Sequence, residues 1–172
     1  MTFFTVTYVE VGATLSDAGA AALTSYREAV GDTRLDVLQR IDRSNQFAVL
    51  GAWADQQAFE ASAHDAAASA LNDKLGAALA APNDTRQHSG LSVAAAKPGE
   101  APILVVTHVD VVPPQKDNAV TALQQLAEAS RKHAGNRHFD VWQQTNRPNH
   151  FTVVEAWADR GSFDDHSMQP PT

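Results

Sequence analysis

Apolar and polar residues alternate over a short segment near the start of each half of the chain, at residues 3–11 and 103–111. Both segments are rich in β-branched and aromatic residues, and alternation with a period of two is typical of a strand with one buried face. Two more such segments follow in each half, separated by a polar turn that predicts a hairpin. They cover residues 35–41 and 46–53 in the first half, and 139–144 and 150–157 in the second.

Between the strands, apolar residues recur at intervals of three and four, which predicts amphipathic helices. The helix after the first strand ends at a glycine in each half, Gly31 and Gly135, as helices commonly do. The next helix begins after an aspartate, Asp55 and Asp159, a residue type that accepts hydrogen bonds from the first N–H groups of a helix. In the first half, this alanine-rich pattern predicts one long helix that is closed by Pro82.

The two halves of the chain are copies of one another. Residues 35–59 and 139–163 align without a gap, and twelve of the twenty-five aligned residues are identical. The first strands also align, but at a spacing of 100 residues instead of 104. We place this four-residue difference inside the first helix, because about one added turn leaves the apolar face pointing in the same direction. The identity indicates an internal duplication.

With residues 86–94 as a fourth strand, the first copy has the order β-α-β-β-α-β of a ferredoxin-like fold. We therefore predict an α+β protein with domains at residues 1–96 and 103–172 and a linker at residues 97–102. The second copy has only fifteen residues after Trp157, so we expect it to be truncated at its C-terminus, in nature or by design, without its last strand. Two open sheet faces packed together would bury apolar surface, so the two units would form a dimeric α+β barrel within one chain.

Composition narrows the class of protein. The 172 residues carry a net charge of −7, which argues against a nucleic-acid or anionic membrane surface. The chain has no cysteine, which excludes disulfides, thiolate nucleophiles and cysteine-based metal centres. No apolar run approaches the ~20 residues that span a bilayer, and the first residues lack the basic region of a signal peptide. We predict a soluble, cytoplasmic protein.

The most informative motif is a strand that ends in tryptophan and is followed by Ala-Asp, an aromatic residue and then a histidine nine residues after the tryptophan. In the second copy it comprises residues 151–166, FTVVEAWADRGSFDDH. The motif resembles the antibiotic biosynthesis monooxygenase family, and the resemblance covers nearly the whole chain as two copies. It implies the dimeric α+β barrel. Enzymes of that family oxidise polycyclic phenols or anthrones with O₂ without flavin or metal, so the resemblance implies no cofactor.

The resemblance singles out Glu155 and His166 as catalytic candidates. Glu155 and Trp157 are two residues apart and therefore share one face of a strand, and His166 would meet Glu155 where strand and helix join. In the catalytic interpretation, His166 is a general base or hydrogen-bond donor that Glu155 adjusts. In the alternative, the pair is a polar contact that fixes the helix on the sheet. The first copy has Gly51 and Ser62 at these positions, so only the second copy would carry this chemistry.

A small aromatic substrate would lie in an apolar pocket between sheet and helices. Trp53 and Trp157 would form its wall or belong to the core. Tyr8 and His108 occupy equivalent positions on the first strands and would bind a phenolic oxygen if they face the pocket; otherwise they lie in the barrel interface. Tyr26, on the apolar face of the first helix, would reach the same cavity. The histidines show no HxH or HExxH spacing, so no metal site is predicted.

The leading hypothesis is a cofactor-independent monooxygenase that oxidises a small aromatic, quinol or polyketide-like substrate with O₂. A base would deprotonate the phenol, the carbanion would pass an electron to O₂, and the two radicals would recombine. The alternatives are a non-catalytic ligand-binding or structural barrel and an isomerase on the same barrel. Two fused copies suffice as a pseudo-dimer, while the edge left by the missing strand leaves a homodimer as an alternative.

Overall fold

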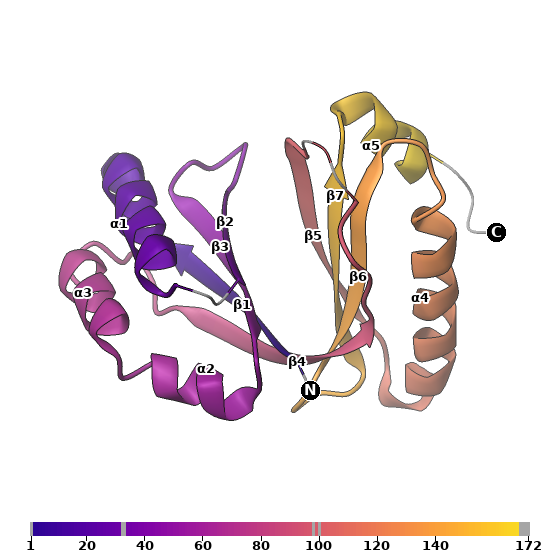
Figure 1. Cartoon of the computed structure of the whole chain (residues 1–172), viewed down its shortest axis with the longest axis horizontal. Helices are drawn as coiled ribbons and strands as arrows, with labels where there is room; N and C mark the ends of the chain where they lie inside the picture. Colours follow the sequence, from indigo (N-terminus) through magenta and orange to yellow (C-terminus); the bar gives the residue numbers. More distant parts are fainter. Residues whose placement is uncertain (1, 32–33, 98, 100, 169–172) are drawn as a thin grey trace. The chain divides into compact units, whose positions relative to one another are not determined.

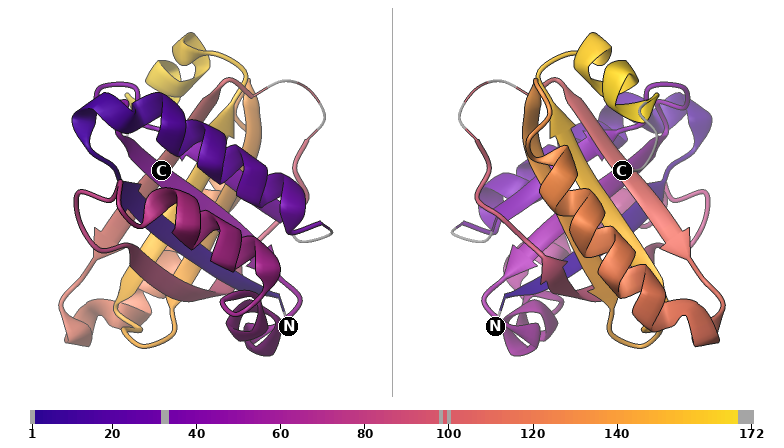
Figure 2. Two further views of the ribbon diagram at one scale, coloured as in Figure 1. Left: turned by 90° about the vertical axis from the view of Figure 1, so that its left-hand side faces the viewer. Right: turned by 90° about the vertical axis from the view of Figure 1, so that its right-hand side faces the viewer.

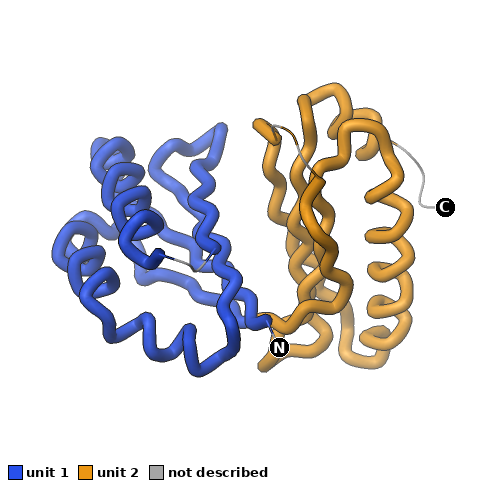
Figure 3. The backbone as a smooth tube through the Cα atoms, viewed as in Figure 1, with its two compact units in different colours: residues 1–87 blue, residues 88–172 orange. Residues whose placement is uncertain are grey.

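A computed structural model describes residues 2–31, 34–97, 99 and 101–168. The chain forms two compact units, Met1–Gln87 and His88–Thr172 (Figures 1 and 3). Each unit is an α+β structure in which helices cover one face of an antiparallel sheet (Figure 2). In the described ranges, no helix is long and apolar enough to cross a membrane.

Unit 1 builds its sheet from strands in the order β2-β3-β1, with the start of β4 beside β1. Strands β1 and β3 pair along their full length, from Phe3 opposite Trp53 to Glu10 opposite Gln46. Helices α1 and α3 pack side by side across one face of this sheet (Figure 2). The elements are β1 Phe3–Glu10, η1 Ala13–Leu15, α1 Ser16–Ala29, β2 Arg34–Gln39, β3 Gln46–Trp53, α2 Gln56–Ser62, α3 Ala66–Leu75 and β4 Asp84–Ser92.

Unit 2 repeats this arrangement with strands in the order β4-β6-β7-β5, of which β4 contributes its second part. Helix α4 lies across one face of the sheet (Figure 2). The described part of unit 2 ends with α5 and has no counterpart of α3. The elements are β5 Ile103–Asp110, η2 Pro113–Gln115, α4 Lys116–Ser130, β6 Asn136–Gln144, β7 His150–Trp157 and α5 Arg160–Ser167. The predicted strands, hairpins and element order are thus confirmed, with end shifts of up to three residues.

The single alanine-rich helix predicted after Asp55 is wrong. The structure has two helices there, α2 and α3, with a break at residues 63–65. The Asp65 carboxylate accepts a hydrogen bond from the backbone N–H of Ala68 at 2.8 Å, just as Asp55 accepts one from Ala58 at 2.8 Å. An aspartate in this role favours a helix start, so the segment contains two starts where periodicity suggested one.

The predicted position of the four-residue length difference is also wrong. Helix α4 is only one residue longer than α1, and the additional residues form a turn that ends at Gly135. Gly31 and Gly135 have nearly equal positive φ angles, 73° and 74°, so both copies leave the helix in the same way. In unit 2, the Arg131 guanidinium donates to the carbonyls of Phe139 and Ser92, at 2.9 and 3.0 Å. These bonds hold the added residues against the sheet and outside the helix.

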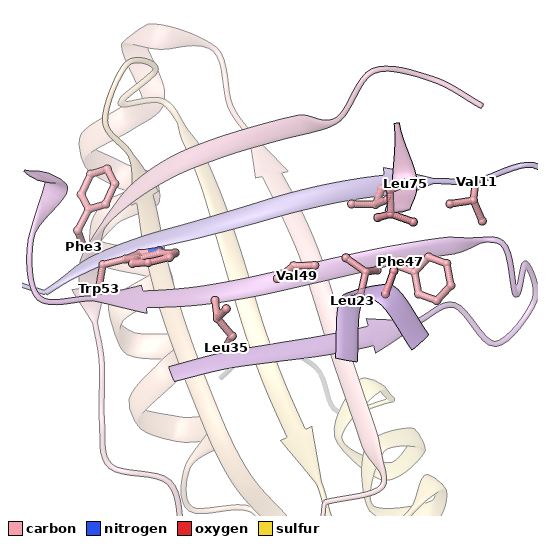
Figure 4. Packing of buried hydrophobic residues seen from close by; sticks show 10 residues of the cluster. Phe3, Val11, Leu23, Leu35, Phe47, Val49, Trp53 and Leu75 are labelled. Atoms are coloured by element: carbon pink, nitrogen blue, oxygen red, sulfur yellow. The ribbon is translucent and has the colours of Figure 1, made fainter. Parts of the chain in front are cut away.

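Each unit has its own hydrophobic core between the sheet and its helices. In unit 1, Phe3 and Trp53 lie at one end of this core, and Val11 and Phe47 lie at the other (Figure 4). In unit 2, the buried core comprises Ala119, Leu123, Ala127, Phe139, Val141, Phe151, Val153 and Trp157. Phe47, Val49 and Trp53 of β3 correspond to Phe151, Val153 and Trp157 of β7, so the duplicated positions bury equivalent side chains.

Candidate active site

Glu155 and Trp157 project from the helix-covered face of β7. Trp157 is fully buried, and Glu155 exposes only 7% of its surface. The indole N–H of Trp157 donates a hydrogen bond of 3.0 Å to Oε2 of Glu155. A buried carboxylate needs such a donor, because burial without one carries a large desolvation cost. The tryptophan therefore holds this carboxylate inside the unit.

Helix α5 places His166 over this pair. Asp159 caps the helix by accepting a hydrogen bond of 2.7 Å from the backbone N–H of Ser162. Two turns later, the His166 ring stacks on the Trp157 indole, with ring centroids 4.6 Å apart and planes inclined by 26°. Its Nε2 atom lies 3.7 Å from Oε2 of Glu155. Strand and helix thus bring the two predicted catalytic residues within ion-pair distance.

His133, in the turn after α4, completes the cluster. Its Nδ1 atom lies 2.9 Å from Nδ1 of His166. One imidazole must donate in this contact and the other must accept, because each nitrogen carries either a proton or a lone pair. The turn is fixed beside α5, since the backbone N–H of Ala158 donates to the carbonyl of Gly135 at 2.8 Å. The sequence pattern did not connect His133 with His166.

Burial shifts the pKa values of both catalytic candidates toward their neutral forms. It raises the pKa of Glu155, although the hydrogen bond from Trp157 partly opposes this change. It lowers the pKa of His166, and the charge of a protonated His133 lowers that pKa further. The cluster therefore contains an acid and a base that both resist ionisation, which is typical of groups that exchange protons during catalysis.

In unit 1, the indole N–H of the equivalent tryptophan has a neutral hydrogen-bond acceptor. The indole N–H of Trp53 donates to the hydroxyl of Thr5 at 3.0 Å. Gly51 stands where unit 2 has Glu155, and a Cβ atom there would lie 2.5 Å from Nε1 of Trp53 and 2.6 Å from Oγ1 of Thr5. In unit 2, Val105 takes the place of Thr5 opposite this position. In unit 1 the acceptor for the indole therefore lies on β1, the strand next to the one that carries the tryptophan. In unit 2 the acceptor lies on β7, the strand that carries the tryptophan itself.

Two other predicted residues, Trp53 and Tyr26, belong to the hydrophobic core of unit 1. Burial is the main cause that raises the pKa of Tyr26, followed by the charge of Asp65. Ser62, which corresponds to His166, donates to the carbonyl of Phe59 at 2.7 Å. These side chains form a packed core that lacks the acid–base pair of unit 2.

Tyr8 and His108 lie on the opposite sheet face from the tryptophans, because they occupy the alternate positions of β1 and β5. The Arg86 guanidinium lies 5.3 Å from the ring centre of Tyr8, and burial raises the pKa of Tyr8 to about 12. Nδ1 of His108 lies 3.0 Å from the hydroxyl of Thr152, which lies 2.9 Å from Nε2 of His88. The structure therefore does not bring Tyr8 or His108 to the cluster around His166.

Residues 102–171 match the model of a family described as antibiotic biosynthesis monooxygenase. This segment of the chain is therefore similar to the antibiotic biosynthesis monooxygenase family. It contains the whole cluster of His133, Glu155, Trp157 and His166. A Bacillus subtilis (strain 168) protein named "Putative monooxygenase YcnE" is 25% identical over 65 residues, which cover 38% of this chain and 68% of that protein.

Solved structures with the same fold extend over both copies of the repeated unit. A structure from Fusobacterium nucleatum titled "Putative monooxygenase" has a TM-score of 0.83 and 14% identity, and the match covers 98% of this chain and 81% of that one. A similarly titled structure from Lactobacillus acidophilus NCFM has a TM-score of 0.78 and 11% identity, over 98% and 82%. An "anthrone oxidase-like protein" has a TM-score of 0.71 and 13% identity, over 99% and 78%. These matches establish the fold, and with it the predicted tandem α+β architecture.

The donor set of the domain does not resemble a metal centre. Within the ranges that the structure describes, no three or more His, Asp or Glu side chains are grouped so that they could hold a metal ion. His133, Glu155 and His166 instead form a linear series of contacts, suited to moving a proton.

Proposed function

We propose that unit 2 is a monooxygenase that oxidises a small phenolic aromatic, quinol or polyketide-like substrate with O₂ and needs no cofactor. The observation that carries this proposal is the buried pair of Glu155 and His166 against Trp157, inside the domain that matches the monooxygenase family. The names of the relatives support it, since one is a putative monooxygenase and another is anthrone oxidase-like.

In this mechanism, His166 removes the proton that makes the substrate electron-rich. Its lowered pKa keeps the imidazole neutral and able to accept a proton near pH 7. When Glu155 is ionised, its carboxylate, 3.7 Å away, would stabilise the imidazolium that forms. Trp157 orients both groups, through its stacked ring and its indole N–H.

The later steps balance without another reductant. The substrate anion gives one electron to O₂, and the substrate radical and superoxide combine to form a C–O bond. The peroxide oxygen takes up a proton, directly from the imidazolium or from solvent, and loss of water leaves the ketone. For an anthrone, the sum is anthrone plus O₂ giving anthraquinone plus water, so one oxygen atom enters the product and the other leaves as water.

The test is O₂ uptake by the full chain with a panel of anthrones and quinols. We expect His166→Gln to lower uptake by roughly 10²–10⁴-fold, the usual contribution of a positioned acid–base group. Ser62→Ala, at the equivalent position of unit 1, is the matched control and should leave uptake unchanged. Turnover without O₂ would favour an isomerase. If no substrate supports uptake, and His166→Gln only lowers the melting temperature, the pair has a structural role and the proposal is wrong.

A further inference from the structure

The three ionisable groups of the cluster stand where the two copies differ. Glu155 replaces Gly51, and His166 replaces Ser62. His133 lies within residues 130–134, where the second copy has five residues between the aligned Ala129 and Gly135 and the first copy has only Val30 between Ala29 and Gly31. Residues 33 positions apart in the chain thus converge on one site. Substitutions that arose independently of one another would not be expected to bring these three side chains into one series of contacts.

The contacts run in one line from the surface to the interior of unit 2. His133 is partly exposed, the His166 side chain exposes 14% of its surface, and the Glu155 side chain exposes 9%. The Nδ1 atoms of the two histidines face each other at 2.9 Å, and Nε2 of His166 faces Glu155 at 3.7 Å. Each nitrogen of His166 therefore has a different neighbour, one buried and one closer to solvent.

An imidazole with this geometry can pass a proton through its ring. A proton accepted at Nε2 of His166 allows the proton at Nδ1 to leave toward Nδ1 of His133, which must then be unprotonated. His166 ends as the other neutral tautomer, and His133 releases a proton from Nε2. No bond between heavy atoms changes and no electron is transferred, so the step needs no co-reactant.

We propose that His133 is a positioning residue that carries the proton from His166 to solvent. This inference rests on the proposed function, in which His166 takes a proton from the substrate. The groups that face His166 are His133 from the turn after α4, Glu155 and Trp157 from β7, and Phe139 from β6. Two imidazolium ions at 2.9 Å would repel each other strongly. The pair therefore holds at most one positive charge, which is present while the proton is being passed on.

The first test follows the imidazole ¹⁵N chemical shifts of the full chain by NMR as the pH changes. We expect His133 and His166 to titrate as a coupled pair, in two steps that both rings report. In His133→Asn, which retains a hydrogen-bonding atom close to the position of Nδ1 but cannot relay a proton, His166 should titrate in one step at higher pH. His150→Gln is the control, because His150 pairs with Asp110 at the far end of β7. Independent titration of the two rings in the wild-type chain would overturn the inference.

The second test measures O₂ uptake as a function of pH. Because His133→Asn keeps the contact but removes the relay, we expect kcat to fall by about tenfold, less than the ~10²–10⁴-fold assigned to the direct base. KM should not change, and added imidazole should restore part of kcat. A wild-type pH profile for His133→Asn would overturn the relay and leave the proposed function intact. Absence of uptake by the wild-type chain would contradict the proposed function, while the NMR titration would still decide whether the rings share a proton.

Discussion

At the scale of single residues, the need to satisfy a buried indole N–H is met differently in the two copies. Trp53 and Trp157 are 5% and 0% exposed, so each needs an acceptor. Unit 1 supplies a neutral hydroxyl from Thr5, and unit 2 supplies the carboxylate of Glu155. The carboxylate brings a cost that the hydroxyl does not, because burial disfavours its ionised form.

Glu155→Gln should reveal this cost in the pH dependence of stability. The pKa of Glu155 is raised above its ordinary value of 4.5, so above that pH the folded chain binds more protons at this group than the unfolded chain. The stability of the wild-type protein therefore decreases as pH rises from about 4.5 through the folded pKa. Glutamine keeps an acceptor for Trp157 and does not titrate. The free energy of unfolding of the variant, relative to wild type, should increase with pH in urea titrations between pH 4 and 8. Parallel curves would contradict this prediction.

Sequence alone predicts part of this site. A spacing of two residues places Glu155 and Trp157 on one face, and the family motif adds His166 at the strand–helix junction. His133 could not be predicted in the same way, because its contact depends on the turn that Arg131 and Gly135 shape. The four residues added within 130–134 were the available signal, but a length difference alone does not indicate what the added side chains contact.

At the scale of elements, aspartate caps decide where the helices after β3 and β7 begin. The caps Asp55, Asp65 and Asp159 accept from the backbone N–H groups of Ala58, Ala68 and Ser162. Asp65 shows why sequence periodicity failed here, since an alanine-rich run fits one helix or two equally well. The decision depends on a single side chain that an amphipathic pattern treats as an ordinary surface residue.

Asp159→Ala should disturb the active cluster as well as stability, because α5 carries His166. We expect a lower urea midpoint and a shifted ¹⁵N resonance of His166, as the first turn of the helix loses its acceptor. Asp65→Ala is the matched control: it removes the cap of α3 in unit 1 and should cost about 0.5–2 kcal/mol with no change at His166. An unchanged His166 resonance in Asp159→Ala would show that the ring is held by Trp157 and His133 without the helix start.

At the scale of the whole molecule, the two copies keep one architecture while their chemistry differs. The shared pattern of buried positions in β3 and β7 explains why the fold could be predicted from the repeat. The domain limits predicted from the repeat, residues 1–96 and 103–172, stay a prediction. The boundary between the two compact units falls inside β4, between Gln87 and His88.

A double-mutant cycle in unit 1 should show that a threonine hydroxyl and a glutamate carboxylate are alternative acceptors for the buried indole N–H. Thr5→Val leaves the buried N–H of Trp53 without its acceptor and should cost roughly 1–3 kcal/mol. Gly51→Glu alone crowds both Thr5 and Trp53. The double variant recreates the residue pair of unit 2 and should be less destabilised than the sum of the single variants, as measured by urea unfolding. Additive costs would mean that the exchange of acceptor needs further changes.

Strand β4 also affects how unit 2 can be isolated. Its first residues lie beside β1, while His88, Ser89 and Gly90 pair with Gln144, Gln143 and Trp142 of β6. A fragment that starts at residue 102, where the family match begins, would leave the backbone of β6 unpaired and prone to aggregation. A shortened gene for crystallisation or substrate screening should therefore retain the codons from Asp84 onward, although Glu155 and His166 lie far downstream.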